Sequence, residues 1–225
     1  MIKQITLLVL FIATIGFSQE TINKDLGSFD ELKVFNGLHI SLEKSTNPSI
    51  TISGKKADEV VFKNVNGKLK LSLRFPETFN SNEVDIVLKH TDKLVVIDAN
   101  EGSRITSENK INTDHLELRS QEGALIEFEI KTDYLNVKAV TGGQIILVGK
   151  ATYQDIEVMM GGTYKGYEVE SNHTSVISAS GAVALVNAKV LLDAKVRFGG
   201  TVFYKGKPKD LKTKKIIGGT IKSVD

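Results

Sequence analysis

Cysteine and tryptophan are absent from this 225-residue sequence, and proline occurs only three times. Without cysteine the chain can form no disulfide, no thiolate metal site, no cysteine nucleophile and no lipidated N-terminal cysteine. Neither sign of charge dominates, because 29 lysine and arginine residues stand against 27 aspartate and glutamate residues, which leaves a net charge of +2. So small a net charge gives the whole chain no general attraction to nucleic acid, and we expect no nucleic-acid partner.

Long apolar runs are also missing, except for one at the N-terminus. After a basic start, the stretch Ile5–Ile15 is almost entirely apolar, and small residues follow at Gly16 and Ser18. This order is typical of a secretory signal peptide, so we predict that residues 1–18 are removed by a cut before Gln19. An uncleaved N-terminal anchor is the alternative, although the run is short for a membrane span.

The predicted cleavage assigns the rest of the chain to an exported protein. No second apolar stretch of spanning length follows, so we expect no transmembrane segment after signal cleavage. Residues 19–225 carry no linker composition, which predicts a single domain. Without a cysteine to acylate, we expect it not to be a lipoprotein.

Glycine, in contrast, is abundant and periodic. The sequence holds 19 glycines, and seven of them mark successive units of 19–21 residues. The markers are Gly102, Gly123, Gly143, Gly162, Gly181, Gly200 and Gly219. A fixed period of this length is typical of repeat architectures, in which each unit packs against its neighbours.

Apolar columns run in phase with these glycines. Two residues after the marker stand Leu125, Ile145, Tyr164, Val183, Val202 and Ile221. Four residues before it stand Ala139, Val158, Ile177 and Val196, and two before it Thr141, Met160, Ala179, Phe198 and Ile217. We expect the first column to face the interior, with Val183 between Tyr164 and Val202.

Each unit reads as two short strands joined at a glycine. Apolar and polar residues alternate through Leu135–Ala139, and alternation of this kind indicates β-strand. One such unit cannot bury a face alone, whereas stacked units pair in parallel and turn each column into an interior row. The sequence therefore predicts an all-β fold, a single-chain β-solenoid (parallel β-helix) with coils of about 19–21 residues. A β-sandwich with glycine-rich turns is the alternative, but it has no reason to keep a fixed period.

The part before the regular units is β-rich but less regular. We predict opening coils and an N-terminal cap in residues 29–90, followed by regular glycine-marked coils in 91–225. Asn66-Gly67 is a strong type I′ hairpin signal, so residues 60–75 should fold back as an antiparallel hairpin. We expect a loop at 75–82 and a return to the sheet at Val84–Leu88.

Several segments resemble one bacterial family. They are Phe29–Val34, Gly37–Leu42, Ile50–Gly54, Val65–Leu71, Phe203–Pro208 and Ile217–Ile221. The sequence from about 29 to 224 resembles the putative auto-transporter adhesins through their head domain, the GIN domain. The resemblance implies an exported, all-β, repetitive domain with an adhesin-like role, located in the periplasm or outside the cell at the surface of a bacterium. Its motifs are structural, so it implies no catalytic residue.

Candidate catalytic groups are few. Glu127 and Glu129 share one side of a strand, as do Glu168 and Glu170, and a pair of carboxylates is what a glycan-active enzyme requires. A solvated outer face explains both pairs better, because no acidic residue stands in register on the coils beside Glu127 and Glu129. The histidines are His39, His90, His115 and His173, and their spacing suggests no metal site. We predict no catalytic residue, no metal site and no cofactor.

Three further patterns have both a functional and a structural interpretation. Aspartates precede the first apolar residue of several units, at Asp92, Asp114, Asp133, Asp155 and Asp210, and turn formation explains them better than a calcium site. Lysines cluster at Lys205, Lys207, Lys209, Lys212, Lys214 and Lys215, where they would contact an anionic surface or only keep the edge from pairing. Asn172-His173-Thr174 fits the N-glycosylation pattern, a weak signal.

These observations favour binding or surface architecture over catalysis. The prediction is an exported, non-catalytic β-solenoid, either an adhesin-like module or an envelope scaffold, whose partner is a cell-surface glycan or another copy of itself. A glycan-active β-helix enzyme of the envelope is the alternative. The sequence names no ligand-binding residue.

Overall fold

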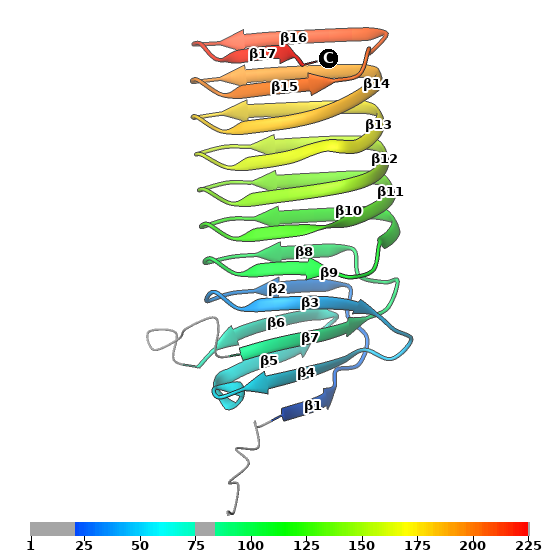
Figure 1. The fold of residues 1–225 in the computed structure, drawn as a ribbon, viewed down its shortest axis with the longest axis vertical. Helices are drawn as coiled ribbons and strands as arrows, with labels where there is room; N and C mark the ends of the chain where they lie inside the picture. Colours follow the sequence, from blue (N-terminus) through cyan, green and yellow to red (C-terminus); the bar gives the residue numbers. More distant parts are fainter. Residues whose placement is uncertain (1–20, 75–83, 225) are drawn as a thin grey trace, which may run out of the picture.

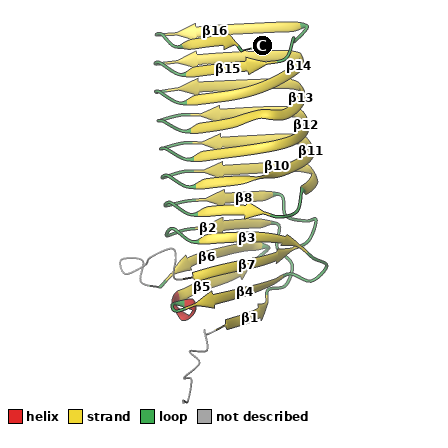
Figure 2. Cartoon of the chain, viewed as in Figure 1, coloured by secondary structure: helices red, strands yellow, loops and turns green. Residues whose placement is uncertain are grey.

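The computed structural model describes residues 21–74 and 84–224, which form a tall stack of β-strands (Figure 1). The predicted signal peptide at 1–18 and the predicted loop at 75–82 lie outside these described residues. Figure 2 shows strands almost throughout, with one 3₁₀ turn at Ala57–Glu59. The prediction of an all-β solenoid is confirmed.

The strands of the N-terminal region are β1 (Thr21–Asp25), β2 (Glu31–Val34), β3 (His39–Lys44), β4 (Ser49–Gly54), β5 (Val60–Val65), β6 (Lys68–Leu73), β7 (Val84–His90), β8 (Val96–Ala99) and β9 (Arg104–Ser107). Those of the regular solenoid are β10 (Ile111–Ser120), β11 (Leu125–Ala139), β12 (Gln144–Val158), β13 (Thr163–Ala179), β14 (Val183–Arg197), β15 (Thr201–Lys205), β16 (Asp210–Ile216) and β17 (Thr220–Ser223).

In the regular solenoid each strand pairs in parallel with the next coil. β11 to β14 are long strands that run from a corner, around a bend, to the next corner (Figure 1). One interior column passes through Ile126, Ile145, Tyr164, Ala184 and Val202, all fully buried. Stacking places like positions about 4.8 Å apart, so apolar side chains form continuous interior rows.

The corners are tight turns with two left-handed residues. Along the stack the first corner residue has φ between 48° and 55°, and the second is always glycine with φ between 71° and 79°. Two positive φ values in a row define a type I′ turn, and glycine adopts that conformation without a Cβ clash. The glycines of this row are Gly102, Gly123, Gly142, Gly161, Gly181, Gly199 and Gly218.

This row corrects the columns predicted from glycine spacing. Where glycines are doubled, the corner glycine is the first of the pair, so the predicted marker is off by one residue in the coils with a single glycine. The interior positions are consequently Ile126 and Ala184, and the predictions for Leu125 and Val183 were wrong, since both are only half-buried. For the same reason Ser178 replaces Ile177 in the second column, and Ser180 replaces Ala179 at the corner.

The N-terminal region stacks its strands out of sequence order. β2 and β3 form a coil that lies between β8–β9 on one side and β6–β7 on the other. β4 pairs antiparallel with β7 and with β1, which closes this end of the stack. The predicted hairpin is confirmed, because β5 and β6 pair antiparallel across Asn66-Gly67. Val84–Leu88 returns to the sheet as part of β7, as expected.

Candidate binding groove

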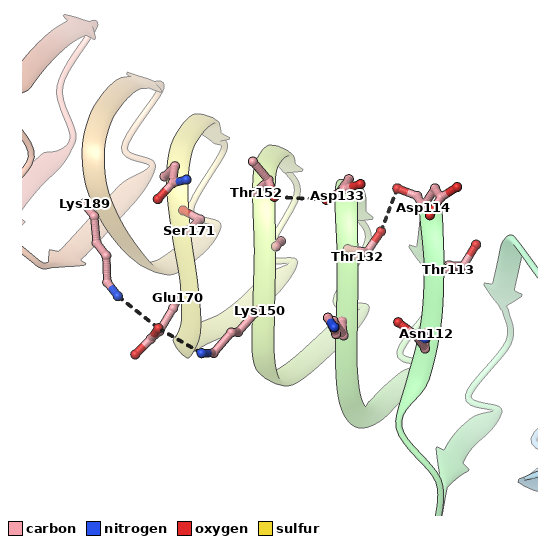
Figure 3. Close-up of a pocket in the computed structure, with 13 residues that line it drawn as sticks. Asn112, Thr113, Asp114, Thr132, Asp133, Lys150, Thr152, Glu170, Ser171 and Lys189 are labelled. Atoms are coloured by element: carbon pink, nitrogen blue, oxygen red, sulfur yellow. Dashed lines mark hydrogen bonds and ion pairs between the residues drawn. The ribbon is translucent and has the colours of Figure 1, made fainter.

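A shallow groove of about 510 Å³ runs across five coils at the bend of the solenoid (Figure 3). Its lining residues come from the same three positions of four successive coils, and the fifth coil adds Lys189. They are Asn112, Thr113, Asp114, Lys131, Thr132, Asp133, Lys150, Ala151, Thr152, Glu170, Ser171, Asn172 and Lys189. The groove is therefore a repeated surface rather than a single pocket.

Strand geometry explains why the groove is polar. Successive side chains of a strand point to opposite faces, so Lys131 and Asp133 face outward while Thr132 between them is buried. The Thr132 hydroxyl donates to the carbonyl oxygens of Asp114 (3.0 Å) and Tyr134 (3.1 Å). These bonds tie the floor of the groove to the coil below and hold the outward side chains in rows.

The rows carry charges of both signs. One row passes from Lys131 to Lys150 and Glu170, where the Glu170 carboxylate lies 2.9 Å from the Lys189 ammonium and 3.8 Å from that of Lys150 (Figure 3). The hydrogen bond from Lys189, with the positive charges of both lysines, lowers the pKa of Glu170 from its usual value. Both lysines and the carboxylate are exposed, so a charged or hydroxylated ligand can bind them in place of these ion pairs.

The second row stands at the crest of the bend. Asp114, Asp133, Thr152 and Asn172 follow one another from coil to coil, and the Thr152 hydroxyl donates to the Asp133 carboxylate at 3.2 Å. The row offers carboxylate, hydroxyl and amide groups at the spacing of the coils. Groups of this kind form hydrogen bonds with hydroxyl-rich ligands.

A bulge in β13 shapes one end of the groove. The register of β13 shifts against both neighbours within residues 165–173. Beneath it, the fully buried Tyr164 packs against Gly166, where a Cβ would lie 2.3 Å from the ring. The Tyr164 hydroxyl donates to the Gln154 side chain at 2.7 Å, and burial raises the pKa of this tyrosine. A glycine at 166 is therefore required for the ring to cross the strand.

Buried hydroxyls continue the polar network toward the groove. The Ser171 and Thr174 hydroxyls lie 2.6 Å apart, and Ser171 donates to the Asn187 carbonyl at 2.8 Å. The Asn187 amide in turn donates to the Tyr167 carbonyl in the bulge at 3.1 Å. Since buried polar groups need partners, this network fixes the bulge and with it the position of Glu170.

An aromatic ladder borders the crest of the bend. The rings of His115, Tyr134, Tyr153 and His173 are stacked, with centroids 4.7, 5.0 and 5.0 Å apart and interplanar angles of 6° to 15°. The rings cover one another's faces, so the ladder presents ring edges and tyrosine hydroxyls to solvent. It stiffens four coils beside the groove rather than offering a stacking platform for a ligand.

The carboxylates considered for catalysis lie in separate ion pairs. Glu127 is 2.8 Å from Arg104, and Glu129 is 2.6 Å from Lys110. Glu168, at the bulge, is 3.3 Å from Lys205, whose ammonium also lies over the Tyr167 ring at 4.9 Å. Of the four acidic residues considered, only Glu170 lines the groove.

The histidines and aspartates also lie in separate parts of the molecule. His115 and His173 belong to the ladder, whereas His39 and His90 lie in the N-terminal region. Asp114 and Asp133 share the crest of the bend, but Asp155 lies in line with Asn136, and Asp210 with Leu191. Within the described ranges, no three His, Asp or Glu side chains gather as a metal site would require. Asn172 of the glycosylation pattern lines the groove.

Sequence reasoning missed the groove because its signal is spread over five coils. Lys131, Lys150, Glu170 and Lys189 recur at the period of the coils, yet each is an ordinary exposed residue alone. A search for polar columns in phase with the apolar ones would have found them.

The chain is similar to a known protein family and to several solved structures. The family described as "Putative auto-transporter adhesin, head GIN domain" matches residues 28–208. A putative adhesin from Bacteroides fragilis has a similar structure, with a TM-score of 0.84, 22% identity and coverage of 92% of this chain and 98% of that one. No curated protein matches the chain.

Two further solved structures are similar at low identity. A putative adhesin from Parabacteroides merdae gives a TM-score of 0.74 at 18% identity, covering 93% of this chain and 98% of its own. A putative lipid binding protein from Parabacteroides distasonis gives 0.71 at 18% identity, with the same coverage. Identities this low establish a common fold and leave the ligand to the residues of the site. Among the described residues, no helix is long and apolar enough to cross a membrane.

Proposed function

Because the chain belongs to the family of putative auto-transporter adhesins with a head GIN domain, we propose that it is an exported, non-catalytic binding module of the bacterial envelope. Its groove would lie against a linear, hydroxyl-rich polymer such as a cell-surface glycan. The apolar N-terminal sequence with its small residues at Gly16 and Ser18 supports export. The adhesin descriptions of the family and its structural neighbours support binding as the task.

One observation carries the proposal: the groove repeats a set of donors and acceptors once per coil. Coil spacing of about 4.8 Å sets the distance between successive members of each row. A polymer whose units have a comparable length can present the same hydroxyl groups to coil after coil. Each contact is weak, and the sum along the groove gives useful affinity.

The groove suits binding better than glycan hydrolysis. Hydrolysis of a glycosidic bond needs one carboxyl group held protonated by a buried, water-poor setting and a second one opposite it. Asp114 and Asp133 are exposed on one crest and do not face each other across a bound chain. Glu127 and Glu129 point to cations on other coils.

The test is binding of the purified protein to arrayed bacterial glycans, in monomeric form and clustered on beads. Lys150→Ala with Asp133→Ala should abolish binding, because it removes one member of each row in the middle of the groove. The matched control is Lys44→Ala with Asp92→Ala, which removes an exposed ion pair of 2.8 Å in the N-terminal region. Clustering should strengthen binding at least about a hundredfold.

A second pair of variants separates binding from catalysis. Asp114→Asn with Asp133→Asn keeps oxygen acceptors on the crest but removes both carboxylates. We expect glycan binding to persist and no substrate turnover before or after the change. Turnover that disappears in this variant, or in Glu127→Gln with Glu129→Gln, would replace the proposal with the enzyme alternative.

A further inference from the structure

The corner row on the edge opposite the bend changes character along the stack (Figure 1). Its first residues are acidic at Glu101 and Glu122, whereas Phe198 and Ile217 occupy the last two corners. These two side chains are 57% and 71% exposed, although both are large and apolar. Met160, two corners earlier, is 55% exposed.

Phe198 and Ile217 are unusual choices for this backbone position. Their φ angles are 48° and 54°, in the left-handed region that bulky and β-branched residues avoid. Asparagine adopts the same conformation readily and stands at the equivalent corner position of Asn36 and Asn66. Neither burial nor backbone preference therefore explains why these two corners carry large apolar residues. Residues kept in such a conformation often serve a function.

Three cations that have no ion pair among the described residues precede these two corners in the sequence. Arg197 directly precedes Phe198, and Lys214 and Lys215 precede Ile217, all three exposed. In the described part of the chain no carboxylate lies within ion-pair distance of any of them. In the coils before them, Arg104, Lys110, Lys138 and Lys150 each pair with a glutamate. Lys131 and Lys165 are the exposed lysines of those coils that have no ion pair among the described residues.

The imbalance extends over the last coils. Residues 189–225 contain ten lysines and arginines and three acidic residues, whereas the whole chain has a net charge of only +2. Lys215 also stands at an interior position, in line with the buried Val196 of the coil before. An inward-pointing lysine on an edge strand disfavours pairing of that edge with another chain. It does not explain Arg197, which stands at a corner, or the exposed apolar side chains.

We propose that this corner docks on an anionic lipid bilayer. Phe198 and Ile217 would enter the boundary between headgroups and acyl chains, while Arg197 and Lys214 contact lipid phosphates. Exposed apolar residues flanked by cations are the combination that binds the surface of such a membrane. The corners lie on the edge opposite the bend (Figure 1), and the groove lies at the bend (Figure 3), so a docked molecule keeps its groove free.

Other partners fit the corner less well. A second copy would bring like charges together, which disfavours self-association at this surface. An acidic polysaccharide would match the cations but would leave Phe198 and Ile217 without an apolar environment. The lipid surface satisfies both features at once.

The absence of tryptophan allows a direct test. Phe198→Trp places a single indole at the corner, and Thr141→Trp places one at an equivalent corner outside the basic coils. With vesicles of phosphatidylcholine and phosphatidylglycerol, the indole emission of the Phe198→Trp variant should shift to the blue and be quenched by brominated lipids. The Thr141→Trp variant should show neither change. Vesicles of phosphatidylcholine alone should produce no shift with either protein.

Asparagine variants separate docking from stability. Phe198→Asn with Ile217→Asn should leave the protein at least as heat-stable as before, because asparagine tolerates the left-handed backbone, yet co-sedimentation with anionic vesicles should be lost. Thr141→Asn is the matched control and should bind normally. Arg197→Gln and Lys214→Gln should each weaken vesicle binding about fivefold.

Three outcomes would overturn the proposal. The first is unchanged vesicle binding by the double asparagine variant. The second is equal binding to neutral and anionic vesicles. The third is binding to a soluble acidic polysaccharide, such as polygalacturonate, with no binding to vesicles, which would assign the cations to a glycan instead.

Discussion

The two ends of this stack use the same coil in different ways. In the regular solenoid, Ile126 lies beside Ile145, its partner 19 residues later. In the N-terminal region, Leu32 of β2 lies beside Ile97 of β8 and Leu69 of β6. The Asn36 backbone and side chain both donate to the Glu101 carboxylate, across 65 residues of sequence. The same corner geometry is thus reached by local contacts in one region and by distant ones in the other.

This difference bears on how each region forms. A coil of the regular region needs only its neighbour, so its stability is roughly a sum over coils and their interfaces. β2 and β3 gain their partners only when β6–β9 are in place, and closing these longer loops costs more entropy before any contact forms. The regular coils should tolerate removal of a unit, whereas the N-terminal region should fold as a whole.

Deleting one coil is the strongest test of the regular region. Removing residues 161–180 joins Met160 to Gly181 and restores a type I′ corner with every later column in phase. Removing 163–181 instead places Val183 in the buried position of Tyr164 and turns the following strand inside out. Circular dichroism and thermal unfolding should show a folded, less stable protein in the first case and a largely unfolded C-terminal part in the second. Equal behaviour of the two deletions would contradict the register.

A point substitution tests the same register with a smaller effect. Ala184→Asp buries a carboxylate among Tyr164 and Val202 with no partner, which should cost at least about 3 kcal/mol of unfolding free energy. Val183→Asp, one residue away on the outer face, should cost less than about 1 kcal/mol. Urea unfolding of both variants measures the difference. The glycine spacing alone predicts the larger loss for Val183→Asp. If Val183→Asp lowers the free energy of unfolding more than Ala184→Asp does, the register predicted from the spacing is the right one.

Corner residues should respond in opposite directions in the two regions. Thr141→Asn replaces a β-branched residue at φ 49° and should stabilise the solenoid by about 1 kcal/mol. Asn66→Thr makes the opposite change at φ 52° in the N-terminal hairpin and should destabilise it by a similar amount. Melting temperatures of the two variants give the comparison, and a loss of stability in Thr141→Asn would remove backbone strain as its basis.

Acid should weaken the N-terminal region first. Burial lowers the pKa of His90 below its ordinary value of 6.5, partly offset by its hydrogen bond to the Thr91 carbonyl. Burial and the nearby Arg104 likewise lower the pKa of His39. As the pH falls, these histidines bind protons in the unfolded chain before they do so in the folded protein. The free energy of unfolding is therefore largest above about pH 6.5 and decreases as the pH falls below that value.

The matched variant is His90→Gln, which removes the more buried of the two histidines. Urea midpoints measured between about pH 7 and pH 5 should fall less for this variant than for the unmodified protein. A pH dependence that is unchanged in His90→Gln would show that this side chain does not carry the effect.

The fold class could be predicted from the sequence because every corner requires the same backbone conformation. A type I′ turn requires a residue with free access to positive φ, and glycine meets that need at every corner from Gly102 to Gly218. The phase was misjudged by one residue where Ser103, Ala124 or Ala182 follows the corner glycine in place of a second glycine. The residue after the corner lies close to the coil before, since a Cβ on Gly143 would stand 2.1 Å from the Ser120 carbonyl oxygen. Spacing alone does not show which glycine of a pair occupies the corner.

The arrangement of the N-terminal strands and the groove could not be read in the same way. The pairing of β2 with both β6 and β8 depends on contacts between distant segments, for which the local pattern holds no signal. The groove depends on Glu170, whose position follows from the β13 bulge and from the buried network of Tyr164 and Ser171. Those polar side chains occupy positions where the alternating pattern suggested only a core.

The aromatic ladder gives this protein an optical property of its own. The chain has five tyrosines and no tryptophan, so tyrosine dominates its near-ultraviolet spectrum. Tyr134 and Tyr153 lie nearly parallel, 8° apart in plane and 5.0 Å between centroids. Electronic transitions of rings this close couple, and the coupling vanishes when the two coils separate. Near-ultraviolet circular dichroism therefore reads the contact between β11 and β12 without any attached label, at the edge where the groove lies.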